Sequence, residues 1–326
     1  MEQKTWLRIL TPDTGKPFSS FDLYLPAGGA HYTQYRFAYQ ENPPKPELAF
    51  HQGPNVPANQ KIYRIHEAYV VKKEGDSFRP LFRALQKGEI GFAVREAGSG
   101  DAVGGYHGDE ILTAVSLQAD GRELDLREPF FGAVEKLRFY QQSHIFRCNT
   151  PSQKLLLHTQ EYTVDGDTLK LSQDVLWLDE GRPMHFASPM LTAQRLDPAD
   201  TDRILTDTVE FYGPDGALVA SCDTSPYGTV NPVPVAKGDS TISACEGTRA
   251  TSAKVYGKKS GLCAEVAFRV LKNTIPDAKT NSFLCIRFMS HTLDNKIYFR
   301  TCSDVSIPRG SRWQADTCYR ITYCCP

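Results

Sequence analysis

The stretch from Gly104 to Glu110 reads Gly-Gly-Tyr-His-Gly-Asp-Glu and holds more reactive side chains than any other part of the chain. Its glycines let the backbone adopt positive φ angles or pass close to a ligand. In an extended strand, His107 and Asp109 would share one face and Glu110 would point to the other. An imidazole beside a carboxylate is how a general base is tuned towards neutral pH. The alternative is a glycine-rich hairpin whose side chains cap nearby backbone groups.

Two neighbouring predicted strands carry the other candidates. His144 and Arg147 belong to the first, and His158, Glu161 and Tyr162 to the second. On a strand, His158 and Tyr162 share one face and Glu161 lies on the other. Consecutive hairpins would bring His144, Arg147 and His158 onto one concave sheet face. There a tyrosine could protonate a leaving oxygen and an arginine could neutralise a carboxylate. The alternative is a solvated sheet face.

Some of the same residues could instead bind a metal ion. His107 and Asp109, with a histidine from another strand, would suit a site of two histidines and one carboxylate. A divalent ion such as Ca²⁺ or Mn²⁺ is therefore an option, but no cofactor is predicted. The chain has no G-x-x-x-x-G-K-[ST] loop, no H-E-x-x-H pair and no G-x-S-x-G turn, which argues against nucleotide-binding, zinc-protease and serine-hydrolase classes.

The elements that must position these side chains are almost all strands. Short alternating runs, such as residues 154–164 and 168–178, are separated by turn sequences like Asp165-Gly166-Asp167. Many antiparallel strands with little helix indicate a sandwich or barrel. We therefore predict an all-β fold, a large antiparallel multi-stranded β-sandwich of jelly-roll or supersandwich-like form, with one or two short helices.

The clearest helix candidate covers residues 77–88. Ser77 can cap it, Pro80 suits an early position and Gly88 can end it. Residues 129–140 fit a second short helix or a strand equally well.

The length of 326 residues allows one large β domain or two smaller ones. We predict a single domain spanning residues 1–326, with a subdivision near residue 200 as the alternative. Proline-rich residues 41–59 and 225–239 are predicted to form long loops, which on a β scaffold often carry function.

The amino-acid composition limits which partners the protein can bind and in which cellular compartment it is expected. Lys+Arg number 37 and Asp+Glu 38, so 37 − 38 gives a net charge of −1, and no basic surplus exists to hold nucleic acid. Apolar runs are too short to span a membrane, and the first residues do not resemble a secretory leader. The nine cysteines are therefore expected to be reduced thiols in a cytoplasmic protein, or in a secreted one if a leader has been removed. Edge or face pairing would allow a homodimer.

Three segments of the chain resemble the β-sandwich carbohydrate-active enzymes, namely polysaccharide lyases and mutarotase-like sugar enzymes. They are the Gly104–Glu110 stretch, the strand pair around residues 144–147 and 158–162, and the run Leu169-Lys170-Leu171-Ser172-Gln173-Asp174-Val175-Leu176-Trp177. The resemblance covers residues 85–200 and points to no single family.

Carried onto this chain, the resemblance implies that His107 is the acid or base and Tyr162 its partner acid. Arg147 would clamp a substrate carboxylate, and Asp109 or Glu110 would orient His107. Mutarotase-like members instead use a histidine and a glutamate on the pyranose ring. We take His107, Tyr162 and Glu110 as the catalytic candidates. The predicted substrate-binding residues are Arg147, His144, His158, Asp109 and Glu161.

The function predicted first is a lyase that cleaves a uronic-acid-containing glycan by β-elimination. A glycoside hydrolase that uses Asp109, Glu110 and Glu161, or a sugar epimerase, is the alternative on the same scaffold. A non-catalytic glycan-binding or structural protein is the third hypothesis, with its histidines and acids scattered over unconnected surfaces.

Overall fold

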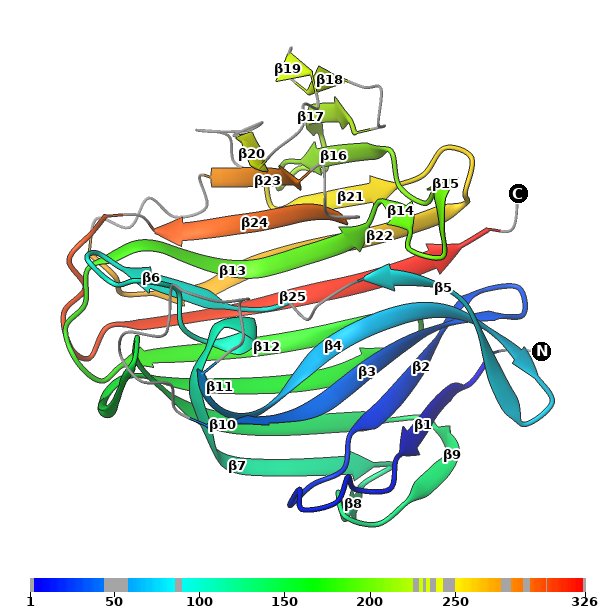
Figure 1. Cartoon of the computed structure of the whole chain (residues 1–326), viewed down its shortest axis with the longest axis horizontal. Coiled ribbons are helices and arrows are strands. Elements are labelled where there is room, and N and C mark those ends of the chain that lie inside the picture. Colours follow the sequence, from blue (N-terminus) through cyan, green and yellow to red (C-terminus); the bar gives the residue numbers. More distant parts are fainter. Residues whose placement is uncertain are drawn as a thin grey trace.

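The computed structural model describes residues 3–43, 58–85, 90–224, 229–230, 233–234, 239–242, 250–276, 283–289, 294–302 and 304–324. Nearly all of them lie in strands or turns, and the predicted all-β fold class is confirmed (Figure 1). Among these residues the one helical element is a single 3-10 turn, η1 (Gly105–His107). None of the described helical structure is long or apolar enough to cross a membrane.

The first sheet has the strand order β9-β1-β2-β3-β4-β5-β13-β24-β23-β20. Its strands are β9 (Phe130–Val134), β1 (Thr5–Ile9), β2 (Phe21–Gly28), β3 (His31–Asn42), β4 (Ala58–Glu74), β5 (Ser77–Leu85), β13 (Pro183–Gln194), β24 (Asp294–Cys302), β23 (Phe283–Met289) and β20 (Asp239–Ile242). The short strand β6 (Ala93–Glu96) also pairs with β13.

The second sheet has the order β8-β7-β10-β11-β12-β25-β22-β21-β16-β17. Its strands are β8 (Arg122–Leu124), β7 (Gly108–Ala119), β10 (Leu137–Arg147), β11 (Thr150–Asp165), β12 (Thr168–Trp177), β25 (Arg312–Tyr323), β22 (Leu262–Asn273), β21 (Ser252–Tyr256), β16 (Thr208–Tyr212) and β17 (Leu218–Asp223). Two small hairpins join β14 (Leu196–Asp197) to β15 (Asp200–Ile204), and β18 (Thr229–Val230) to β19 (Val233–Pro234).

The two sheets face each other across an aromatic core. Phe37 of the first sheet lies with its ring 5.1 Å from Tyr162 and 5.5 Å from Phe139 of the second. In Figure 1 the blue strands β2–β4 cross the green strands β10–β12. A parallel pairing of β4 with β7 joins the sheets at one edge, and every other pairing between described strands is antiparallel. Such burial of aromatic rings from both inner faces is what stabilises a sandwich.

The predicted helix over residues 77–88 is wrong, because residues 77–85 form strand β5. A tight turn with Gly75 at φ 61° places β5 antiparallel to β4, so cross-strand pairing overrides the helical spacing of its apolar residues. Pro80 is accommodated where the register shifts between Val70 and Val71. Gly88 and residues 86–89 lie outside the described residues. Residues 129–140 take the extended alternative, since they contribute β9 and the start of β10.

The proline-rich loop predictions fall largely on residues outside the description: 44–57 in the first, and most of 225–239 in the second. The division into domains stays a prediction. Strands from both sides of residue 200 pair with each other, as in β12 with β25 and β13 with β24.

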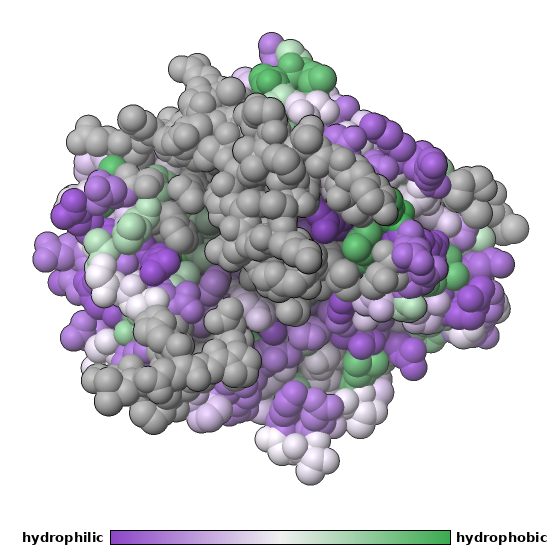
Figure 2. All heavy atoms as spheres, turned by 45° about the horizontal axis from the view of Figure 1, so that its top comes forward, coloured by the Kyte–Doolittle hydropathy of each residue, from purple (hydrophilic) through white to green (hydrophobic). Residues whose placement is uncertain are grey.

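Figure 2 shows one face of the molecule. Among the residues that are coloured there, hydrophilic ones dominate and apolar ones form small patches. The large apolar side chains that are exposed are Phe131, Met184, Leu218, Val219 and Leu271. A homodimer stays a prediction. Six described cysteines take no part in a disulfide bond, namely residues 148, 222, 263, 302, 318 and 324.

Candidate functional site

The glycine-rich stretch forms the turn η1 directly before β7. Gly104 and Gly105 have φ angles of 90° and 54°, in the region that glycine tolerates best. A Cβ atom at Gly104 would lie 2.8 Å from Cδ1 of Phe92, and one at Gly105 would lie 2.9 Å from the Phe92 carbonyl oxygen. The turn therefore requires glycine at both positions.

His107 lies in this turn rather than in an extended strand, so the alternation that would have placed it beside Asp109 does not apply. Its Nδ1 atom is instead 3.7 Å from Oδ1 of Asp101, within ion-pair distance once the imidazole is protonated. The two side chains are 25% and 31% exposed. The backbone N–H of Ala102 donates to Oδ1 of Asp101 at 2.7 Å and helps to hold the carboxylate in place. His107 and Asp101 thus form a partly exposed imidazole–carboxylate pair.

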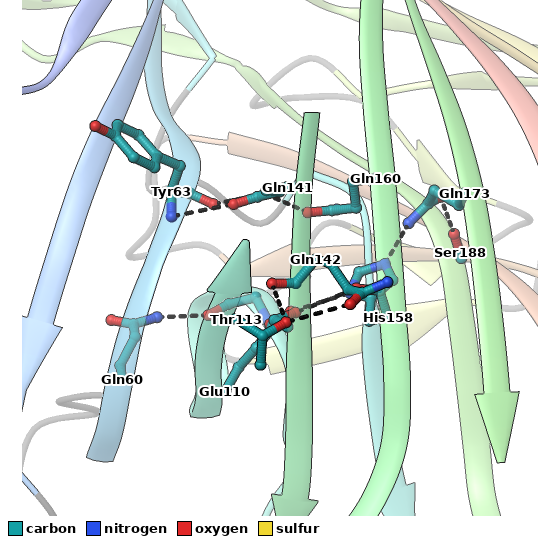
Figure 3. A network of polar contacts seen from close by, with 12 residues as sticks. Gln60, Tyr63, Glu110, Thr113, Gln141, Gln142, His158, Gln160, Gln173 and Ser188 are labelled. Carbon is teal, nitrogen blue, oxygen red and sulfur yellow. Dashed lines mark hydrogen bonds and ion pairs between the residues drawn. The ribbon is translucent and has the colours of Figure 1, made fainter. Parts of the chain in front are cut away.

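Glu110 is the centre of a buried polar network (Figure 3). Nδ1 of His158 lies 3.0 Å from its Oε1 atom, which also accepts a hydrogen bond from the Ser143 hydroxyl at 2.5 Å. The backbone N–H of Gly105 donates to Oε2 at 2.6 Å. The side chains of Glu110 and His158 are only 2% and 1% exposed. The sheet thus brings two of the predicted residues into direct contact, within its interior.

The other ring nitrogen of His158 also has a partner. Its Nε2 atom lies 3.2 Å from Nε2 of Gln173, and the Ser188 hydroxyl donates to Oε1 of Gln173 at 2.8 Å. Both imidazole nitrogens are therefore occupied by protein groups. His158 is placed to orient other residues rather than to contact a ligand.

The hydrogen bonds to Glu110 decide its charge. Burial by itself would raise the pKa of Glu110, but its interaction with His158 and the hydrogen bonds from Ser143 and Gly105 outweigh burial and lower the pKa. Glu110 is consequently a carboxylate at neutral pH, and it acts as an acceptor only.

The pKa of Asp109 shifts in the opposite direction to that of Glu110. It is 1% exposed, with a positive φ of 50°. Burial raises the pKa of Asp109 to about 6, although the N–H of Asn149 and the side chain of Asn59 favour its charged form. The stabilisation that the neutral carboxyl provides is fully present at a pH below 3.8, the ordinary pKa of the group. It is lost as the pH rises through about 6, the pKa in the folded protein.

Replacing Asp109 with asparagine is expected to stabilise the protein at neutral pH. Asparagine tolerates the positive φ angle and its side-chain oxygen can still accept from Asn149, but it carries no charge to bury. We expect the free energy of unfolding at about pH 7 to rise by roughly 1–3 kcal/mol. Urea denaturation from about pH 4 to pH 8 measures this. A gain that does not shrink towards acidic pH would contradict the burial of an ionised Asp109.

A cavity of about 490 Å³ opens beside the segment that holds Asp101. Its volume falls in the range of small-molecule pockets, about 300–1,000 Å³. Its lining is Glu96, Ala97, Gly98, Ser99, Arg147, Cys148, Thr150, Glu180, Gly181, Arg182 and Ser306. The Ser99 hydroxyl donates to the carbonyl of Asp101 at 2.9 Å, so the segment from Glu96 to Asp101 borders both the cavity and the His107–Asp101 pair.

Arg147 lines this cavity, but its guanidinium is already compensated. It forms ion pairs with Glu96 and, at 3.0 Å, with Asp179, and it donates to the carbonyl of Glu180. A substrate carboxylate would therefore have to displace existing partners. Arg147 is better placed to organise the cavity wall than to clamp a uronate.

The remaining predicted residues lie elsewhere. His144 belongs to the half-exposed face of β10, opposite its neighbours Ser143 and Ile145 in the interior. Glu161 pairs with Arg138 at 2.7 Å on the corresponding face of β11. The single concave face predicted for His144, Arg147 and His158 is therefore not formed.

Tyr162 is 2% exposed and lies in the aromatic core. Burial, with the nearby charge of Glu110, raises the pKa of its hydroxyl above the usual value of 10. Its predicted face, shared with His158, is correct, but that face is the buried one. Tyr162 is thus placed as a core residue, away from the described cavity.

A metal site is not assembled by the described residues, among which no group of three or more His, Cys, Asp or Glu side chains could hold an ion. Sequence reasoning missed Asp101, Glu96 and Ser143. The only signal for Asp101 was the turn sequence Gly98-Ser99-Gly100-Asp101, whose approach to His107 depends on the fold.

Comparison with known proteins gives only weak structural similarities. No family model and no curated protein matches the sequence. Among solved structures, a galactose mutarotase-like protein from Clostridium acetobutylicum has a TM-score of 0.46 at 9% identity, covering 98% of this chain and 99% of its own. The galactose 1-epimerase of Lactobacillus acidophilus has a TM-score of 0.39 at 8% identity, with 98% and 99% covered.

An α-galactosidase from Lactobacillus brevis has a TM-score of 0.46 at 10% identity over 96% of this chain, which spans 40% of the galactosidase. Because these TM-scores lie below 0.5, they carry no argument about the function of this chain. The function has to be argued from the site.

Proposed function

We propose that the protein is a carbohydrate-active enzyme that transfers a proton on a neutral sugar, as a sugar epimerase does. His107 is the acid–base residue and Asp101 is its carboxylate partner. The observation that carries the proposal is the partly exposed His107–Asp101 pair, with Nδ1 and Oδ1 3.7 Å apart. Residues 96–99 of the segment that leads to Asp101 line a cavity of about 490 Å³, and the Ser99 hydroxyl donates to the Asp101 carbonyl. A histidine near a carboxylate is suited to proton transfer at neutral pH.

The lining of the cavity supports a hydroxyl-rich ligand. Ser99, Thr150 and Ser306 offer hydroxyl groups, which can both donate and accept hydrogen bonds. The charges of Glu96 and Arg147 are paired with each other. A neutral sugar can bond to such groups without leaving a buried charge unpaired, whereas a uronate would add negative charge next to Glu96.

The other enzyme mechanisms have less support. The lyase mechanism needs a tyrosine acid and an arginine clamp, but Tyr162 is buried in the core and Arg147 already has two carboxylate partners. The hydrolase mechanism needs carboxyl groups across a cleft. Asp109 and Glu110 are both buried, and Glu161 pairs with Arg138 on another face.

The proposal is tested by incubating the protein with a panel of neutral aldoses and following anomer and epimer interconversion by ¹H NMR. In parallel, uronate oligomers are monitored for the ultraviolet absorbance of an unsaturated product. We expect accelerated interconversion of at least one neutral sugar and no unsaturated product. Binding of neutral sugars without any interconversion would instead identify a non-catalytic binding protein, and an unsaturated product would restore the lyase hypothesis.

A further inference from the structure

The hydrogen bonds of the buried network run in one direction. Glu110 is an acceptor only, so His158 must donate from Nδ1, which leaves Nε2 as an acceptor in the neutral ring. Gln173 then donates its amide N–H to Nε2, and its Oε1 atom accepts from Ser188. The tautomer of His158 and the orientation of the Gln173 amide follow from this polarity. Donors from β13, β12 and β11 thus lead to one carboxylate on β7 (Figure 3).

The network ends on the backbone of the turn that carries His107. The N–H of Gly105 donates to Oε2 of Glu110 at 2.6 Å, and the side chain of Gln60 donates to the carbonyl of Gly105 at 2.6 Å. Both polar backbone groups of Gly105 are therefore held by side chains of the sheets. The N–H of His107 in turn donates to the carbonyl of Gly104 at 3.0 Å, which ties the imidazole-bearing residue to the same unit.

We propose that Glu110 is the positioning residue for His107 and that the chain Ser188–Gln173–His158 serves to fix Glu110 in that role. The inference rests on the proposed function for its catalytic meaning, but the mechanical link can be measured without any substrate. It gives the buried contacts of Glu110 a role in placing His107, the proposed acid–base residue.

The most selective variant is Glu110→Gln. Glutamine has the same shape, but one of its two terminal atoms is an NH₂ group, and three donors converge on this position: His158, Ser143 and Gly105. At least one of them must then lose its acceptor. We expect the amide proton of Gly105 to exchange with solvent about 10- to 100-fold faster, which corresponds to the loss of one charge-assisted hydrogen bond. We also expect kcat to fall about 10-fold or more, with KM little changed.

The control is Asp22→Asn, which also neutralises a buried carboxylate. The Asp22 side chain is 2% exposed, pairs with Arg36 at 2.8 Å across β2 and β3, and accepts a hydrogen bond from the Tyr24 hydroxyl. It should lower overall stability but leave Gly105 exchange and kcat unchanged. Amides of the β22–β25 ladder serve as an internal reference, because a purely global loss of stability would accelerate their exchange as well.

The outcomes separate the two proposals. Faster Gly105 exchange in a protein without turnover on any sugar would keep the positioning role and end the proposed function. Unchanged exchange and unchanged kcat in folded Glu110→Gln would overturn the positioning role alone. If that variant does not fold, Ser143→Ala removes one donor and should accelerate Gly105 exchange several-fold; no change there would equally overturn the inference.

Discussion

Replacing His107 with glutamine is expected to lower kcat on the responsive sugar by about 10²- to 10⁴-fold, the usual contribution of a general acid or base. Glutamine retains hydrogen-bonding groups of similar reach but cannot take up and release a proton near neutral pH. Because His107 is 25% exposed in its side chain and lies in a turn, the substitution should change the melting temperature little. Steady-state rates and thermal melting of the same preparation would measure both effects.

Two companion variants test whether the loss is specific. His31→Gln changes another histidine, whose ring contacts Tyr323 at 4.9 Å rather than the turn, and should leave kcat unchanged. Asp101→Asn keeps the shape of the partner but removes its charge, and should lower kcat less than the loss of His107 itself. Turnover in His107→Gln within a few-fold of the unmodified protein would remove His107 from the mechanism.

Replacing Tyr162 with alanine is expected to lower the free energy of unfolding by about 3–5 kcal/mol, as is typical for the removal of a buried aromatic ring. Tyr162 contacts Phe37 and Phe139, with ring centroids at 5.1 Å and 5.9 Å, and is 2% exposed. The cavity left between the two sheets cannot be filled by small movements of these large rings. Chemical denaturation followed by tryptophan fluorescence gives the value.

The conservative variant Tyr162→Phe separates packing from chemistry. It retains the ring and its contacts, so turnover should remain close to that of the unmodified protein. A loss of about 10²-fold or more with the fold intact would show that the hydroxyl takes part in the reaction, and would revive the lyase mechanism predicted from the sequence.

The strand pattern could be predicted from the sequence because apolar and polar residues alternate along each strand. The hairpins through β10, β11 and β12 follow as expected, and His158 and Tyr162 share a face as the two-residue period requires. The period does not say which face another sheet will cover. The resemblance implies a catalytic role for Tyr162, whereas the structure places its side chain in the core. The error over β5 has a similar origin, since pairing with β4 decided between two locally acceptable conformations.

By itself, the sequence determined the all-β class and the demand for glycine around residue 104, and it predicted functional roles for His107 and Glu110. These depend on composition, local spacing and backbone freedom, which act within a few residues. Only the tertiary structure decided their partners. Asp101 rather than Asp109 lies next to His107, while Glu110 meets His158 across 48 positions of sequence. Such contacts are set by sheet order and register, because burial of the aromatic core fixes which strands become neighbours.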